Sequence, residues 1–262
     1  MFSNLSAFIG NSISTFPDYP AEVRAPKGTL SGVSGFQVHL GAEGVYTPGD
    51  KADVLVAMNP AALKVNVKNI KKNAVVIFDT DSFLKSDLEK ALFTTTDPFA
   101  ELGLGSVQQV PVPMTSMVKH AVEGTGLDAK AAMKSKNMFA LGLICWLFDR
   151  PLERAILMLQ NKFGKKPSVL EANIKVLTDG YNYGNNIHAS VSTFRIEGHA
   201  SQPGTYTDIN GNKATAYGLV AASEKAHLPL FLGSYPITPA TDILHELAKL
   251  KELNVKTVQA ED

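Results

Sequence analysis

Residues 228–240 read Leu-Pro-Leu-Phe-Leu-Gly-Ser-Tyr-Pro-Ile-Thr-Pro-Ala. The apolar start predicts a short strand over Leu228–Leu232, and Gly233-Ser234 predicts a turn of small residues. A helix is expected from about Ala240. Ligands of open α/β sheets bind beyond the carboxyl ends of the strands. The loop between this strand and this helix is therefore expected to be a binding loop.

The prolines of the loop restrict its backbone. Pro236 and Pro239 fix their own φ angles and limit the residues before them, so the loop is expected to be stiff. A stiff loop holds the Thr238 hydroxyl and nearby amides in place for an anionic or polar ligand. The alternative is an ordinary strand-to-helix turn, with Thr238 as the N-cap and Pro239 at the first helical position.

The elements around this loop predict one βαβ unit with a helix in front of it. The flanking helices are expected over Asn212–Ala226 and Thr241–Leu250, and a second strand over Val255–Gln259. A parallel pair of strands places both carboxyl ends on one side of the sheet. Thr238 and Glu261 are therefore expected on the same rim.

The longer N-terminal part alternates strand and helix patterns. The apolar runs at residues 53–57 and 74–79 are typical of strands buried on both faces of a parallel sheet. A mostly parallel α/β layer structure up to about Arg195 is expected, with Val54, Leu55, Val56, Val75, Ile77, Val110, Leu141 and Trp146 in its core. Further strands are expected over Ser12–Phe16, Val33–Leu40 (with one more polar face) and Ser106–Val112, and helices over Ala61–Val67, Met114–Glu123, Asp128–Phe148, Pro151–Phe163 and Ser168–Thr178.

Composition favours a soluble cytoplasmic protein. The 262 residues carry no net charge, and 45% of them are hydrophobic, so a sizeable core can form. The absence of a basic block argues against nucleic acid and anionic lipid as partners. The sequence shows no bilayer-spanning run and no signal-peptide pattern.

Other candidate chemistry in the sequence is weak. Cys145 is the only cysteine, which excludes an intrachain disulfide and an iron–sulfur cluster held by this chain alone. It lies in an apolar helix pattern and is expected to serve packing. The histidines are scattered, and His245-Glu246 lacks the second histidine of a zinc motif, so no metal site is predicted. Gly103-Leu-Gly105 lacks the third glycine of a dinucleotide fingerprint and predicts a loop.

Several blocks resemble the thiamine-dependent 2-oxoacid:ferredoxin oxidoreductases. Tyr235-Pro-Ile-Thr-Pro239 resembles the signature that opens the family's pyrimidine-binding domain. The order of domains is similar to the α subunit of the 2-oxoglutarate type. Further similar blocks are Phe16–Leu30, Gly35–His39, Asp53–Pro60, Lys136–Gly142, Gly211–Gly218 and Thr257–Asp262.

The resemblance implies a division of the chain. Residues 1–197 would be the α/β γ domain, with a mostly parallel sheet and flanking helices. Residues 198–210, rich in turn formers, would be a linker. Residues 211–262 would begin the pyrimidine-binding domain. Both ends are expected to be incomplete, and this chain alone is expected to be inactive.

The resemblance also implies an activity for the complete complex. It would oxidatively decarboxylate a 2-oxoacid, with 2-oxoglutarate favoured, to an acyl-CoA and pass electrons to ferredoxin. Thiamine diphosphate would be shared with a β subunit, while magnesium and an iron–sulfur cluster would belong to the partner in a hetero-oligomer. Coenzyme A would be the co-substrate. The alternatives are a non-catalytic assembly or coenzyme A-contacting module, and a pyruvate or branched-chain 2-oxoacid enzyme.

The same resemblance suggests roles for individual residues. Thr238 would contact the substrate carboxylate, and Tyr235, Pro236, Ile237 and Pro239 would form the cofactor loop. Glu261 would be a neighbour of the glutamate that activates the cofactor, or an acidic residue at a frayed end. Arg24 and Lys27, in a Gly/Pro-punctuated loop, would bind coenzyme A phosphates or a partner subunit, or be solvated surface.

Overall fold

The computed structural model describes residues 1–18, 30, 33–123, 125, 130, 133–187, 193–199 and 209–260. The chain forms two compact units that divide between residues 201 and 202. This division falls inside the range 198–210 that the sequence marks as turn-rich. Within the described ranges, no helix has both the length and the apolar character needed to span a bilayer.

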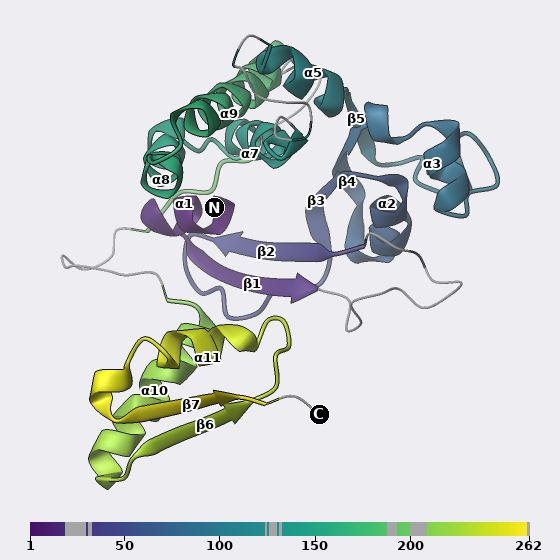
Figure 1. Cartoon of the computed structure of the whole chain (residues 1–262). Coiled ribbons are helices and arrows are strands. Elements are labelled where there is room, and N and C mark those ends of the chain that lie inside the picture. The colour runs from purple at the N-terminus through teal and green to yellow at the C-terminus, as the bar shows by residue number, and fades with distance from the viewer. Residues whose placement is uncertain are drawn as a thin grey trace. The chain divides into compact units, whose positions relative to one another are not determined.

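The first unit is built around a three-stranded parallel sheet in the order β3-β4-β5 (Figure 1). The strands are β3 (Ala52–Ala57), β4 (Ile70–Asp79) and β5 (Gln108–Val112). The register aligns Val54 with Val75 and Ile77 with Val110. The prediction that the two apolar runs belong to one parallel sheet is therefore confirmed.

Helices cover both faces of this sheet, as Figure 1 shows. Val75 and Ile77 pack with one group of helices, and Ala74 and Val76 pack with the other. Burial on both faces explains why β4 is apolar at successive positions. The first group is α5 (Met114–Ala121), α7 (Lys136–Leu147) and α9 (Pro167–Ile187), and the second is α2 (Pro60–Asn66) and α4 (Pro98–Glu101). Other helices of this unit are α1 (Phe2–Phe8), α3 (Lys85–Lys90) and α8 (Leu152–Phe163).

Helices α7 and α9 approach each other closely because glycines line their contact. A Cβ on Gly142 would lie 2.0 Å from the carbonyl oxygen of Leu177, and one on Gly180 would lie 2.1 Å from that of Phe139. Helix α9 continues to Ile187, well beyond the predicted end at Thr178, although glycine and asparagine are poor helix formers. Packing against α7 outweighs this weak propensity.

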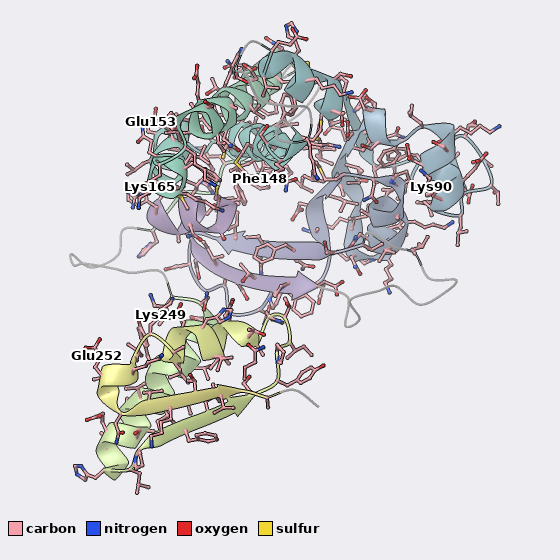
Figure 2. The ribbon with its side chains drawn as sticks, viewed as in Figure 1. Lys90, Phe148, Glu153, Lys165, Lys249 and Glu252 are labelled. Carbon is pink, nitrogen blue, oxygen red and sulfur yellow. The ribbon has the colours of Figure 1, made fainter. Side chains whose placement is uncertain are left out.

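Helix α7 is buried on several sides, as its apolar sequence predicts. One side joins the core around Val75 and Ile77, and another packs with α1 and α8. At its C-terminal end, Phe148 stacks on Phe194 with ring centroids 5.2 Å apart, and it contacts Phe2 (Figure 2). The helix begins at Lys136, after a turn at Lys134 and Ser135. The predicted earlier start at Asp128 falls on residues outside the described ranges.

A buried carboxylate joins the carboxyl end of β4 to two helices. Asp79 is fully buried and forms an ion pair with Lys136 at the start of α7. Its carboxylate accepts hydrogen bonds from the Ser82 hydroxyl (2.6 Å) and from the Thr115 hydroxyl of α5 (2.9 Å). Lys136 also donates to the Ser82 hydroxyl at 3.0 Å. The central strand is thereby connected to the N-terminal ends of both α5 and α7.

This network lowers the pKa of Asp79. Burial alone raises the pKa of a carboxyl group, because it disfavours the charged form. The hydrogen bonds from Lys136, Ser82 and Thr115, together with the Lys136 charge, outweigh that effect and hold the pKa of Asp79 below its ordinary value.

Two N-terminal strands depart from the expected mostly parallel sheet. β1 (Ser12–Asp18) and β2 (Gly35–Gly41) form a separate antiparallel pair. Phe36 is exposed on the face expected to be less polar, while Gln37 and His39 on the other face are partly buried, so the face expected to be more polar is not the more exposed one. Within the described ranges this ribbon pairs with no further strand.

The core prediction is confirmed for most residues and only in part for β3, where Val54, Leu55 and Val56 pack against the two buried clusters without being fully buried themselves. Val75, Ile77, Val110, Leu141 and Trp146 are buried as expected. The predicted core residues of β3, which are Val54, Leu55 and Val56, are only partly buried. Among the residues that the structure describes, β3 pairs with β4 alone, which leaves its other side uncovered.

The second unit has the predicted helix and βαβ order. It contains α10 (Gly211–Ala226), β6 (Leu230–Ser234), α11 (Thr241–Leu247) and β7 (Val255–Gln259). Its small core gathers Ala216, Leu247 and Val255. β6 begins and ends two residues later than the predicted Leu228–Leu232, because Gly233 and Ser234 pair with Val258 and Gln259 and do not form a turn.

We expect Gly142→Ala to destabilise the first unit by about 1–3 kcal/mol, because the methyl group would force α7 and α9 apart. Gly218→Ala is the matched control, since this helical glycine has no atom within 4 Å of a built Cβ. The control should stabilise its own unit by about 0.5–1 kcal/mol. Denaturant unfolding of both variants measures the two effects. Equal and favourable effects would contradict the close approach of the helices.

We expect Asp79→Asn to destabilise the protein by about 3 kcal/mol at neutral pH, because it leaves Lys136 without its charged partner. Asp79 has a lowered pKa in the folded state, so its contribution is present above the unfolded pKa and is lost as the pH falls through the folded value. The variant should therefore lose less stability on acidification than the wild type.

Asp53→Asn is the control for this experiment. Asp53 pairs with Lys71 at 2.7 Å, but both side chains are more than half exposed. That change should cost no more than about 1 kcal/mol. Urea unfolding between neutral pH and about pH 3, through the ordinary pKa of an aspartate, compares the variants. An Asp79→Asn protein that matches Asp53→Asn would show that the Asp79 network contributes little.

Candidate functional site

The candidate site lies where β6 and β7 end. The two strands run parallel, with Leu230 opposite Val255 and Ser234 opposite Gln259. The pairing continues one step further, because the Ala260 amide donates to the Ser234 carbonyl at 2.9 Å. The loop after β6 therefore starts at the same edge of the sheet where the chain leaves β7, as the sequence predicted.

Residues 235–240 form a loop that is tied down at several points. The Thr241 amide and the Thr241 hydroxyl both donate to the Ile237 carbonyl, each at 2.9 Å. The Asn212 side chain, near the start of α10, donates to the Pro239 carbonyl at 2.8 Å. The peptide bond between Thr238 and Pro239 is cis. The loop is thus anchored to both helices of its unit.

Thr238 does not cap the helix that follows. Helix α11 begins at Thr241, and its N-cap is Ala240, which makes no side-chain capping bond. The interpretation of Thr238 as N-cap and Pro239 as first helical residue is therefore wrong. The turn before α11 is instead held by Thr241, whose amide and hydroxyl both donate to the Ile237 carbonyl. Within the described ranges the exposed Thr238 hydroxyl makes no hydrogen bond, so it can donate to a ligand.

Apolar side chains flank this hydroxyl. Tyr235 is 54% exposed and Ile237 is 52% exposed, and both prolines of the loop are exposed as well. An aromatic ring and a branched aliphatic side chain beside one free hydroxyl suit a ligand with a flat apolar part and a polar group. This is the usual composition of a small-molecule site, mostly apolar with a few polar groups that fix orientation.

Three of the sequence-predicted site residues lie outside the described residues. These are Arg24 and Lys27 in the N-terminal part, and Glu261 at the end of the chain. Ala260, which directly precedes Glu261, is the last residue described, and it is hydrogen-bonded to the end of β6. The structure brings Tyr235, Pro236, Ile237, Thr238 and Pro239 together in one loop.

Two side-chain contacts at the carboxyl ends of the strands were not predicted from the sequence. Asn212 anchors the loop from a position far away in the chain, and the only signal for it is the block at residues 211–218. The second of these contacts is the hydrogen bond from the Thr115 hydroxyl to the Asp79 carboxylate at the end of β4. An aspartate at the end of an apolar strand and a threonine at the start of a helix suggest such a contact, but they do not reveal the partners.

The single cysteine has no reactive setting. Cys145 is fully buried in α7, and burial raises the pKa of its thiol to about 12. This confirms the packing role. Among the residues that the structure describes, no three His, Cys, Asp or Glu side chains gather in a way that could hold a metal ion. The described part of the chain thus presents a hydroxyl and apolar groups at its candidate site.

Comparison with known proteins extends over the whole chain. The family model for pyruvate ferredoxin/flavodoxin oxidoreductases matches residues 6–183. The chain is 46% identical over 261 residues to the 2-oxoglutarate oxidoreductase subunit KorA of Mycobacterium tuberculosis, covering all of this chain and 40% of that protein. It is 26% identical over 148 residues to the α subunit of 2-oxoacid:ferredoxin oxidoreductase 1 of Aeropyrum pernix, covering 55% of this chain and 22% of that subunit.

A solved structure agrees with these relatives. The 2-oxoglutarate:ferredoxin oxidoreductase of Magnetococcus marinus, with 2-oxoglutarate, coenzyme A and succinyl-CoA bound, superposes with a TM-score of 0.70 at 27% identity. The match covers all of this chain and 40% of that one. The chain thus spans about two fifths of the length of these two full-coverage relatives. On the evidence of the family match over residues 6–183 and of the parallel sheet with its flanking helices, the chain belongs to the pyruvate ferredoxin/flavodoxin oxidoreductase family.

Proposed function

We propose that this chain is part of a 2-oxoacid:ferredoxin oxidoreductase that oxidatively decarboxylates 2-oxoglutarate to an acyl-CoA and passes the electrons to ferredoxin. The observation that carries the proposal is the 46% identity over the whole chain to a 2-oxoglutarate oxidoreductase subunit. The superposition on a 2-oxoglutarate:ferredoxin oxidoreductase supports the same substrate. The exposed Thr238 hydroxyl, unbonded within the described ranges, is available to donate a hydrogen bond to a substrate.

In this proposal the two units have different roles. Residues 1–197 are the γ domain, residues 198–210 are the linker, and residues 211–262 begin the pyrimidine-binding domain. The division of the chain between residues 201 and 202 supports these limits. The βαβ order of the second unit also suits the start of a larger α/β sheet.

The loop after β6 would hold the substrate and one end of thiamine diphosphate. Thr238 donates its hydroxyl hydrogen to the substrate carboxylate. Tyr235 and Ile237, both about half exposed, offer apolar contact to the aminopyrimidine ring, and Pro236 and Pro239 keep the loop in shape. Glu261 follows the last residue of β7 by two positions in the sequence and would add negative charge near the same rim. When bound, thiamine diphosphate supplies the electron sink that decarboxylation requires.

The remaining components would come from other chains. A β subunit shares the thiamine diphosphate and carries magnesium and the iron–sulfur cluster. These 262 residues, with one cysteine, cannot hold a four-thiolate cluster alone. Arg24 and Lys27 would bind coenzyme A phosphates or contact that subunit. The working assembly is a cytoplasmic hetero-oligomer with ferredoxin as electron acceptor.

Reconstitution tests this function directly. The full-length subunit is combined with its β partner, and reduction of ferredoxin is followed with 2-oxoglutarate, pyruvate and branched-chain 2-oxoacids in the presence of coenzyme A. We expect the highest kcat/KM with 2-oxoglutarate. A higher value with another 2-oxoacid would overturn the substrate, and no reduction with any of them would overturn the function.

We expect Thr238→Ala in the complete enzyme to lower kcat/KM for the 2-oxoacid by one to two decades. A charge-assisted hydrogen bond to a carboxylate contributes about 1.5–3 kcal/mol. Thr238→Ser keeps the hydroxyl and is the matched control, so it should retain most of the activity. Thiamine diphosphate affinity should be similar in all three proteins.

Steady-state kinetics and calorimetric titration of the cofactor measure these effects. Thermal unfolding of both variants provides the structural check, and it should show little change because Thr238 neither caps α11 nor makes a hydrogen bond in the described part of the chain. An unchanged kcat/KM in Thr238→Ala for every 2-oxoacid would refute the substrate contact.

A further inference from the structure

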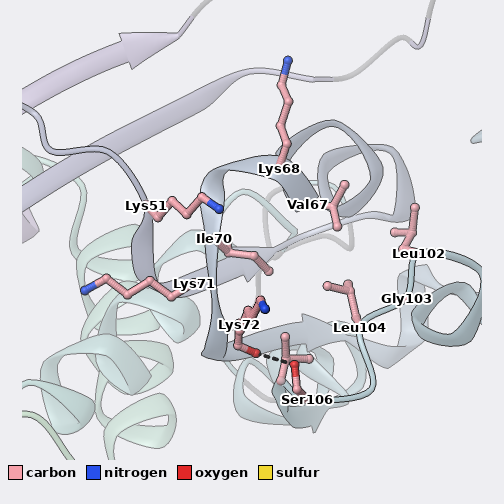
Figure 3. Close-up of a pocket in the computed structure, with 11 residues that line it drawn as sticks. Lys51, Val67, Lys68, Ile70, Lys71, Lys72, Leu102, Gly103, Leu104 and Ser106 are labelled. Atoms are coloured by element: carbon pink, nitrogen blue, oxygen red, sulfur yellow. Dashed lines mark hydrogen bonds between the residues drawn. The ribbon is translucent and has the colours of Figure 1, made fainter.

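A pocket of about 230 Å³ lies at the amino-terminal end of the parallel sheet in the first unit (Figure 3). It is formed where β3 and β4 begin, at Lys51 and Ile70, and where the chain enters β5, near Ser106. Asp79 lies at the opposite, carboxyl-terminal end of β4. The pocket therefore belongs neither to the Asp79 network nor to the loop after β6.

The lining of this pocket is strongly basic. It includes Lys51, Lys68, Lys71 and Lys72, and it includes no aspartate or glutamate. Lys71 has a counterion, since it pairs with Asp53 at 2.7 Å. Within the ranges that the structure describes, the other three lysines form no ion pair. Unpaired like charges around one hollow repel one another, and a bound anion would relieve that repulsion.

The lysines surround an apolar floor. Ile70, Leu104 and Val107 are buried at the pocket, and Gly103, with φ of 67°, leaves space because nothing lies within 4 Å of a built Cβ. Figure 3 shows the Lys72 side chain directed into the space between Ile70 and Leu104, and Lys51 reaching across the start of β4 toward it. Lys68 and Lys71 point away from the hollow.

The backbone around the pocket is held in place. The Ser106 hydroxyl donates to the Lys72 carbonyl at 2.8 Å, which connects the segment before β5 to the start of β4. Lys72 is thus carried by a backbone segment with a fixed neighbour. A lysine binds phosphate as a compact point charge on a flexible stem.

We propose that this pocket binds a small anion that carries a diphosphate group. The ammonium groups of Lys51 and Lys72, both directed at one hollow, match two adjacent phosphoryl groups. The apolar floor offers contact to a base or an alkyl group attached to the diphosphate. A nucleic acid strand would need a longer basic track, and the chain as a whole carries no net charge. This site is independent of the proposed oxidoreductase function.

Calorimetric titration of the full chain with inorganic pyrophosphate and, separately, with ADP tests the proposal. We expect saturable binding of at least one of them. Lys51→Gln/Lys72→Gln should weaken that binding by about a hundredfold, because each of the two lost charge-assisted contacts accounts for about a decade. Lys51→Arg/Lys72→Arg should retain most of it.

Lys165→Gln/Lys166→Gln is the matched control. Both lysines are exposed between α8 and α9, and Lys165 is labelled in Figure 2. This variant removes the same charge from the protein but should bind like the wild type. Tighter binding of ADP than of pyrophosphate would identify a nucleotide as the source of the diphosphate, and equal binding would identify the inorganic group as sufficient.

Three results would overturn the proposal. The first is no binding of either compound at millimolar concentration, and the second is equal weakening in the Lys51/Lys72 and Lys165/Lys166 glutamine variants. The third is tighter binding of an oligoglutamate peptide than of both compounds, which would show that the lysines recognise an acidic protein surface.

Discussion

Parallel pairing brings the carboxyl ends of neighbouring strands to one edge of a sheet, and the candidate site of this chain depends on that geometry. In the second unit the register from Leu230–Val255 to Ser234–Gln259 fixes where both strands stop. The further hydrogen bond from Ala260 to Ser234 keeps the two exits together. The loop at residues 235–240 and the segment after β7 then share one rim, whatever the side chains on them.

The two units use the same kind of edge in different ways. In the first unit this edge offers no free polar group at Asp79. Its carboxylate is buried, pairs with Lys136 and accepts hydrogen bonds from Ser82 and Thr115. In the second unit the edge is open, with Tyr235 and Ile237 half exposed and the Thr238 hydroxyl unengaged in the described ranges. A closed edge stabilises the packing of helices on the sheet. An open edge with a tied-down backbone is suited to a ligand, because little conformational entropy remains to be lost on binding.

Much of this could be predicted from the sequence. The apolar runs of β3 and β4 predicted the parallel sheet. The prolines predicted the loop after β6 and the helix that follows it. The sequence could not show that Gly180 allows α9 to continue along α7, because propensity alone ends that helix early. Nor could it show the two-residue shift of β6, which arises from its pairing with β7.

Thr238 looks like a helix cap in sequence, and only the hydrogen bonds of Thr241 exclude that role. The pocket is lined from three separate stretches of the chain, near residues 51, 67–72 and 102–107, so their convergence is visible only in the fold.

The central proposal is that the Thr238 hydroxyl, which makes no hydrogen bond within the described ranges, donates to a substrate carboxylate. A crystal structure of the complete enzyme with its 2-oxoacid bound measures this directly, through the distance from Thr238 Oγ1 to the carboxylate oxygens. The account predicts a hydrogen bond of about 2.5–3.0 Å. A substrate carboxylate bound by other groups, with the Thr238 hydroxyl turned toward the protein, would contradict it.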